Sequence, residues 1–181
     1  MPATRIMLIR HAEKPDDTHG GVDPKGAADK HDLIVRGWQR AGALTQFFAK
    51  PRDPNGPIKP PTAIFATEPS SPTASKRPLH TVTPLAKFID VDIDSSITEG
   101  SEPDLVNKAS ASNGVVLIAW HHEAIPAIAN LILQNHSAPQ KWPGDRFDVV
   151  WIFSRTAANA PWTFAQAPQL LLSGDLPNVI K

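Results

Sequence analysis

The sequence contains no cysteine among its 181 residues. This absence excludes disulfide bonds, cysteine-ligated zinc and thiol nucleophiles. Neither sign of charge is in excess, because eighteen Lys and Arg residues balance eighteen Asp and Glu residues. A neutral chain has no general electrostatic attraction for nucleic acid or for an anionic membrane, so we expect neither partner. Any anion chemistry must therefore depend on a local arrangement of charges.

Long hydrophobic runs are also missing. No segment approaches the roughly 18 apolar residues that a membrane-spanning helix needs, and the first residues carry no cleavage-like site of small side chains. We therefore expect a soluble, cytoplasmic protein. The length suits one domain over residues 1–181. Proline is plentiful, with 19 residues, and predicts rigid loops such as the connection at residues 50–61.

Short apolar segments alternate with segments of helical periodicity. Apolar runs of strand length lie at residues 6–9, 62–66, 115–120 and 147–153, with a weaker run at residues 91–93. Helical spacing of apolar residues is found at residues 33–48 and 124–133. The alternation predicts an α/β fold, a three-layer α/β/α sandwich with a mostly parallel central sheet. Pro168 bars the last apolar segment, residues 162–175, from the centre of a sheet, and the segment is expected to form an edge strand or a strap.

Basic and imidazole side chains follow three of the predicted strands. Arg10 and His11 follow the first, Arg77 lies in the loop and helix after the second, and His121 and His122 follow the run at 115–120. Because ligands gather at the carboxyl ends of parallel strands, we expect these side chains to converge. Arginine matches phosphate oxygens with a planar fork of donors, and a neutral imidazole can attack phosphorus. The pattern therefore predicts an oxyanion site.

Metal binding is not expected at this site. Adjacent residues such as His121 and His122 point to opposite sides of a strand and cannot easily hold one ion, and the sequence has no HExxH or HxH motif. We therefore predict no metal and no other cofactor. His80 is interpreted as a neutral histidine on a helix face that bonds a backbone carbonyl. Glu13 is interpreted as a loop cap or as part of the rim of the crevice.

Four segments in the same order resemble the smaller branch of the histidine phosphatase superfamily, the phosphoglycerate mutase-like proteins. The segments are LIRHAEK, LIVRGWQRAGAL, KRPLHTVTPLA and VVLIAWHHEAIP. The resemblance implies a metal-independent phosphatase that hydrolyses a phosphomonoester through a phosphohistidine at His11. Arg10 and Arg77 are then phosphate ligands. The implied partner is a small phosphorylated substrate or a phosphoprotein, with phosphate or another oxyanion in the pocket.

The resemblance leaves two assignments open. An ungapped match makes His121 the histidine that completes the pocket, whereas a variant form with Trp-x-His would select His122; we favour His121. The general acid is implied to be a carboxylate from the loop after the third strand. Glu99 is the first choice there and Glu102 the second, and Glu123 beside the histidines is a third candidate.

Two other functions fit the same residues. One is a catalytically weak module that binds a phospho-ligand or a protein on the same fold. The other is phosphoryl transfer of the phosphoglycerate mutase type, which needs a lid to keep the phosphoryl group from water. The presence of both Arg10 and His11 favours an enzyme, and the short chain offers little insertion to build such a lid.

Overall fold

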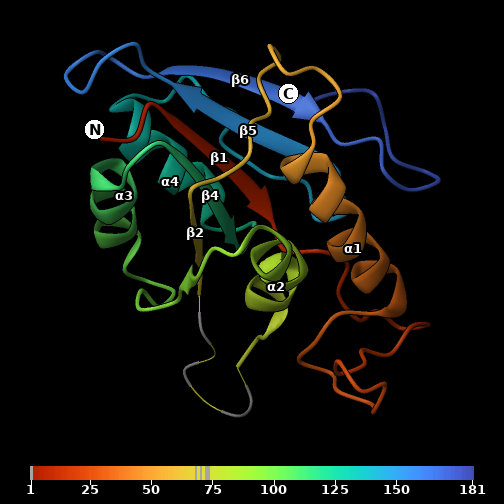
Figure 1. The fold of residues 1–181 in the computed structure, drawn as a ribbon. Helices are drawn as coiled ribbons and strands as arrows, with labels where there is room; N and C mark the ends of the chain where they lie inside the picture. The colour runs from red at the N-terminus through yellow and green to blue at the C-terminus, as the bar shows by residue number, and fades with distance from the viewer. Residues whose placement is uncertain (1, 68, 70, 72–73) are drawn as a thin grey trace.

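The computed structural model describes residues 2–67, 69, 71 and 74–181, which form a six-stranded sheet covered by helices on both faces (Figure 1). The strand order is β3-β2-β4-β1-β5-β6. The strands are β1 (Arg5–Arg10), β2 (Ala63–Ala66), β3 (Ile93–Asp94), β4 (Val115–Trp120), β5 (Val149–Ser154) and β6 (Thr163–Pro168). The sheet is mostly parallel, and β6 is an edge strand that ends at Pro168, as predicted.

Strand β5 differs from the simple alternating pattern, because it runs antiparallel to both β1 and β6. A strand parallel to β1 would have to begin beside the amino end of β1. Instead, the connection at residues 134–148 reaches the carboxyl end of β1, where the carbonyl of Gly144 accepts a hydrogen bond from Arg10 Nη1 at 2.7 Å. Strand β5 then begins beside the carboxyl end of β1 and runs antiparallel to it. The direction of β5 is thus decided by a contact between residues far apart in sequence.

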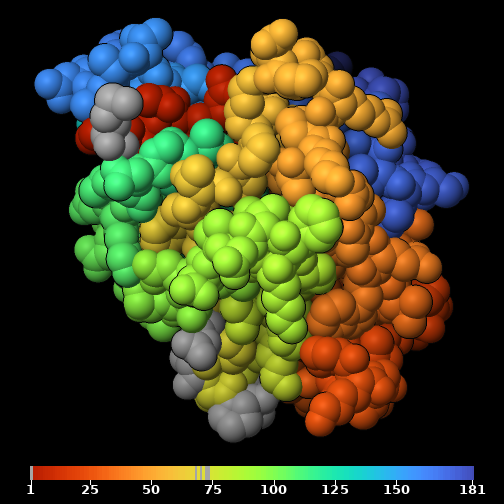
Figure 2. Space-filling model, in the orientation of Figure 1, coloured from red at the N-terminus to blue at the C-terminus, as the bar shows by residue number. Residues whose placement is uncertain are grey.

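The helices cover the sheet in two pairs. They are α1 (Val35–Ala49), α2 (Arg77–Ile89), α3 (Glu102–Ala111) and α4 (Ile125–Leu133). Helices α1 and α2 lie against each other over one face, where they appear in orange and yellow-green in Figure 2. Helices α3 and α4 cover the other face. The predicted three-layer α/β/α sandwich is confirmed, although α3 is a helix that the sequence analysis does not anticipate.

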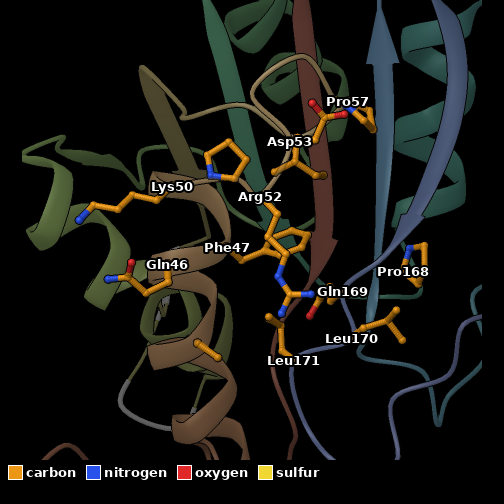
Figure 3. Close-up of a pocket in the computed structure, with 14 residues that line it drawn as sticks. Gln46, Phe47, Lys50, Arg52, Asp53, Pro57, Pro168, Gln169, Leu170 and Leu171 are labelled. Atoms are coloured by element: carbon orange, nitrogen blue, oxygen red, sulfur yellow. The ribbon is translucent and has the colours of Figure 1, made fainter.

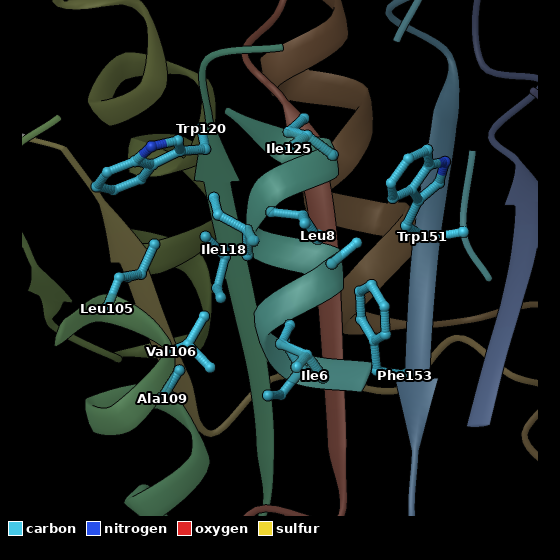
Figure 4. Close-up of a cluster of buried hydrophobic side chains, with 14 of the residues drawn as sticks. Ile6, Leu8, Leu105, Val106, Ala109, Ile118, Trp120, Ile125, Trp151 and Phe153 are labelled. Atoms are coloured by element: carbon cyan, nitrogen blue, oxygen red, sulfur yellow. The ribbon is translucent and has the colours of Figure 1, made fainter. Parts of the chain in front are cut away.

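The two faces of the sheet have separate cores because successive strand residues point to opposite sides. Ile6 and Leu8 of β1 pack with the buried residues of α3 and α4 (Figure 4). Met7 and Ile9 pack with those of α1 and α2. The same alternation in β4 places Trp120 on the α3 and α4 side. It also determines which side chains leave each strand end toward which face.

Within the described residues, no helix is long and apolar enough to cross a membrane.

Candidate active site

The strand register brings two of the predicted histidines together. Strand β1 pairs in parallel with β4 so that Arg10 lies opposite Trp120, and the amide of His11 donates to the carbonyl of Trp120 at 3.0 Å. The next residues on the two strands are His11 and His121, which therefore leave the sheet on the same side. Their rings meet edge to face with centroids 5.6 Å apart. The convergence expected at the carboxyl ends of the strands is present.

His11 is held as a neutral, oriented imidazole. Its side chain is buried, with the residue 2% exposed, and Nδ1 lies 2.7 Å from the carbonyl oxygen of Ala12. A carbonyl only accepts, so Nδ1 carries the proton and Nε2 keeps its lone pair. Burial lowers the pKa of His11 well below its usual value, and the positive charges of Arg10 and Arg77 lower it further, against the hydrogen bond to Ala12. At neutral pH the ring is therefore uncharged, with a lone pair on Nε2.

Arg10 is fixed along one edge of its guanidinium. Nη1 donates to the carbonyl oxygens of Gly144 and Arg146 at 2.7 and 3.0 Å, and the guanidinium carbon lies 3.8 Å from the centroid of the Phe147 ring. Among the described residues, Nε and Nη2 of this buried side chain have no hydrogen-bond partner. Burial lowers the pKa of Arg10 to about 10, which still leaves the group charged at neutral pH. A buried cation with unpaired donors favours an anion beside it.

Arg77 is placed at the start of α2 by Thr81, one turn further along the helix. Thr81 Oγ1 donates to the carbonyl of Arg77 at 2.7 Å and accepts from the amide of Ala12 at 2.8 Å. One buried hydroxyl thus ties the chain just after His11 to the first turn of α2. Burial lowers the pKa of Arg77, whose Nε has no partner among the described residues. Thr81 stands four residues after Arg77 in the KRPLHT segment, and this is the spacing that places its hydroxyl beside the Arg77 carbonyl.

His121 and His122 lie in different surroundings. His121 faces His11, and its Nε2 is 3.8 Å from Oε2 of Glu99. Burial lowers the pKa of His121, and the charge of Glu99 opposes that effect. His122 Nδ1 instead lies 2.8 Å from Oε2 of Glu123, and its pKa is lowered by burial and by Arg10. The alternation of side chains along β4 explains why only one of the two rings meets His11.

The three candidate carboxylates also lie in different surroundings. Glu99 is 61% exposed at its side chain and lines a cavity of about 400 Å³ together with His121, Ser75 and other residues. Glu102 Oε1 accepts hydrogen bonds from Trp120 Nε1 and from the amide of Gly100, both at 3.1 Å. Glu123, 68% exposed, lies outside that cavity and beside His122. Of the three, Glu99 alone shares a cavity with His121.

Behind the site lies a buried ion network that was not expected from the sequence. Glu13 is buried rather than at a rim, and Arg40 Nη2 lies 2.8 Å from its carboxylate and 2.7 Å from that of Asp175. The network joins the chain after His11 to α1 and to the C-terminal segment. One signal for it exists in the sequence: Arg40 falls on the buried face of α1 with Gly37, Ala41 and Leu44.

His80 also differs from its predicted environment. Its Nδ1 lies 2.8 Å from both carboxylate oxygens of the buried Asp32, instead of bonding a backbone carbonyl. Its ring packs beside that of Trp38, with centroids 5.3 Å apart. The difference arises because the partner comes from the loop before α1, which the periodicity of α2 does not report. Within the described part of the chain, no group of three or more His, Asp or Glu side chains is arranged to hold a metal ion.

Comparison with known proteins identifies the fold. No protein-family model matches the sequence, and no curated protein matches it significantly. Among solved structures, phosphoserine phosphatase from Entamoeba histolytica aligns with a TM-score of 0.57 at 15% identity, covering 93% of this chain and 99% of that one. A mycobacterial glucosyl-3-phosphoglycerate phosphatase solved in complex with VO3 gives 0.53 at 13% identity, with 89% and 97% covered. Phosphoglycerate mutase from Plasmodium falciparum gives 0.51 at 11% identity, with 97% and 98% covered.

These three structures share their fold with this protein over nearly the whole chain. The protein thus has the phosphoglycerate mutase-like fold. The resemblance stated from the four sequence segments is confirmed at the level of the fold. At identities of 11 to 15% the likeness concerns the fold, and the chemistry must be argued from the site itself.

Proposed function

We propose that the protein is a phosphatase that hydrolyses a phosphomonoester without a metal, through a phosphohistidine at His11. One observation carries the proposal. His11 is buried and neutral, its Nδ1 is occupied by the Ala12 carbonyl, and it lies among Arg10, Arg77 and His121. A lone pair fixed in a cationic, desolvated environment suits attack on a phosphate ester.

The two arginines are the proposed phosphate ligands. Arg10 and Arg77 both have unpaired guanidinium donors among the described residues, and neither is paired with a carboxylate. A phosphoryl group would satisfy these donors and neutralise the buried charge of Arg10 and the half-buried charge of Arg77. The mycobacterial glucosyl-3-phosphoglycerate phosphatase was solved with VO3, the vanadium counterpart of the PO3 unit that a phosphatase transfers. His121 would add a donor to the oxygens that gain charge during transfer.

The proposed reaction has two steps. In the first, His11 Nε2 forms a bond to phosphorus while the ester P–O bond breaks, and the leaving oxygen takes a proton from a general acid. In the second, water attacks the phosphohistidine, its proton goes to the same carboxylate, and the N–P bond breaks to release inorganic phosphate. The first step leaves the carboxylate deprotonated, and the second returns its proton, so the two steps together restore the site without any redox partner.

Glu99 is the proposed general acid. It shares a cavity with His121, whereas Glu102 is held by Trp120 and Gly100 and Glu123 lies beside His122. Glu99→Gln should slow the hydrolysis of an alkyl phosphate by about 100-fold or more, because an alkoxide needs protonation to leave. The release of 4-nitrophenolate in the first turnover should slow much less, because this leaving group needs no proton. Glu123→Gln is the matched control, and equal effects of the two variants would reject Glu99 as the acid.

The proposed activity is tested by turnover of 4-nitrophenyl phosphate with EDTA present. We expect activity that EDTA does not remove and that His11→Ala abolishes. Rapid acid-free quenching of the wild type with labelled substrate should trap a protein-bound phosphoryl group that is labile to acid and stable to base. Residual turnover above a few per cent in His11→Ala would reject the nucleophile. Vanadate binding without any turnover would instead favour the phospho-ligand binding module.

A further inference from the structure

A second cavity lies away from the residues proposed for catalysis. It is bounded by the C-terminal half of α1, by residues 50–58 and by the chain at residues 168–171 (Figure 3). Its volume is about 320 Å³, at the lower end of the range for small-molecule sites. None of the residues proposed to act on phosphate lines it. We call this cavity the α1 groove.

The α1 groove has an apolar lining. Phe47 from α1, Ile58 from the proline-rich segment and Leu171 after β6 all contribute to it. Leu170, at the same place, is 49% exposed and has a left-handed backbone with φ of 52°. That conformation is unfavourable for a leucine, and the exposed side chain adds to the cost. An apolar ligand that covered Leu170 would recover the part of this cost that comes from the exposed side chain.

A cation without a partner lies at the same groove. Among the described residues, the guanidinium of Arg52 makes no hydrogen bond or ion pair, and Figure 3 shows it between Phe47 and Leu171. Two of the neighbouring polar side chains already have partners. Gln169 Oε1 accepts from Arg40, and Asp53 Oδ1 accepts from the amide of Asn55. Lys50, the other cation of the lining, has its Nζ 5.9 Å from the centroid of the Phe88 ring. Arg52 is therefore the cation of the described lining that is left to pair with an anionic ligand.

We infer that the α1 groove is a binding site for a small carboxylate with an apolar body. The carboxylate pairs with the planar donor fork of Arg52, which matches it in charge and geometry. The apolar body lies on Phe47 and Leu171 and covers Leu170. A neutral molecule of the same shape would leave Arg52 unpaired, and a phosphorylated sugar would not use the apolar surface. The site is independent of the phosphatase activity proposed for His11.

Titration calorimetry with octanoate tests this inference, with octanamide as the neutral probe of the same length. We expect octanoate to bind the wild type with a Kd of about 1 mM, ordinary for so small a ligand. Octanamide should bind about tenfold more weakly, because it lacks the charge-assisted pairing. Arg52→Gln should remove the preference for octanoate. Lys141→Gln removes one positive charge outside the groove and should retain it.

A second variant and a competition experiment locate the bound probe. Ala43→Phe places a ring in the groove and should abolish the binding of both probes, since Ala43 lines it. Inorganic phosphate should leave octanoate binding unchanged. Displacement by phosphate would put octanoate at Arg10 and Arg77, and it would overturn the inference. So would equal octanoate affinity in the wild type and Arg52→Gln, or no binding to the wild type at all.

Discussion

Gly37 lies so close to the backbone of Glu13 that there is no space for a larger side chain. A Cβ atom added there would lie 2.5 Å from the carbonyl oxygen of Glu13 and 3.1 Å from its amide nitrogen. Nonbonded carbon and oxygen atoms do not approach so closely, and the obstacle is backbone rather than a flexible side chain. Gly37→Ala must therefore move α1 away from the chain that follows His11.

The size of the effect follows from two opposing contributions. Alanine improves helix propensity over glycine by about 1 kcal/mol, whereas overpacking a closed contact costs about 1–3 kcal/mol. Gly42, on the same helix, provides a control because an added Cβ there meets nothing within 4 Å. Gly42→Ala should therefore gain only the stability that comes from the better helix propensity of alanine. The difference in unfolding free energy between the two variants should therefore equal the free-energy cost of the clash, about 1–3 kcal/mol.

Thermal and urea unfolding of both variants measure this difference. Each kcal/mol corresponds to a shift of about 2–4 °C in Tm for a chain of this size. Turnover of 4-nitrophenyl phosphate should also fall in Gly37→Ala, because Glu13 and His11 share a short segment and small displacements of a nucleophile are costly. Gly42→Ala should keep the wild-type rate. A Gly37→Ala protein as stable as Gly42→Ala would refute the reasoning.

Three further outcomes are expected. Arg40→Met leaves the buried carboxylate of Glu13 without its main partner, so it should lower the unfolding free energy by about 3–5 kcal/mol in urea titrations; a loss under 1 kcal/mol would contradict this. Because burial lowers the folded-state pKa of His11, only the unfolded chain takes up that proton below about pH 6.5, so stability falls as the pH drops. Unfolding titrations between pH 7.5 and 5.5 should therefore show a smaller loss for His11→Asn, and an unchanged slope would argue against a neutral buried ring. His121→Ala should lower kcat by about 100-fold or more, while His122→Ala costs less than tenfold; the reverse ranking would assign the pocket to His122.

Much of the fold and of the site could be predicted from local patterns. Strand-length apolar runs and helical spacing report which faces are buried, because burial repeats with the period of each element. The basic and imidazole residues follow strands, and the carboxyl ends of parallel strands meet, so Arg10, His11, Arg77, His121 and His122 are expected to converge. The structure brings His11 together with Arg10, Arg77 and His121, and it places His122 beside Glu123.

Contacts between distant residues decided the rest. The direction of β5 depends on the chain at Gly144 reaching Arg10, and no periodicity in either segment reports that contact. The burial of Glu13 depends in the same way on Arg40 and Asp175, which come from two other parts of the chain. The choice between the adjacent histidines depends on the register of β1 and β4, since a shift of one residue would present His122 to His11 instead. A local sequence pattern records how buried a residue is, whereas its partner is set only when the whole chain has packed.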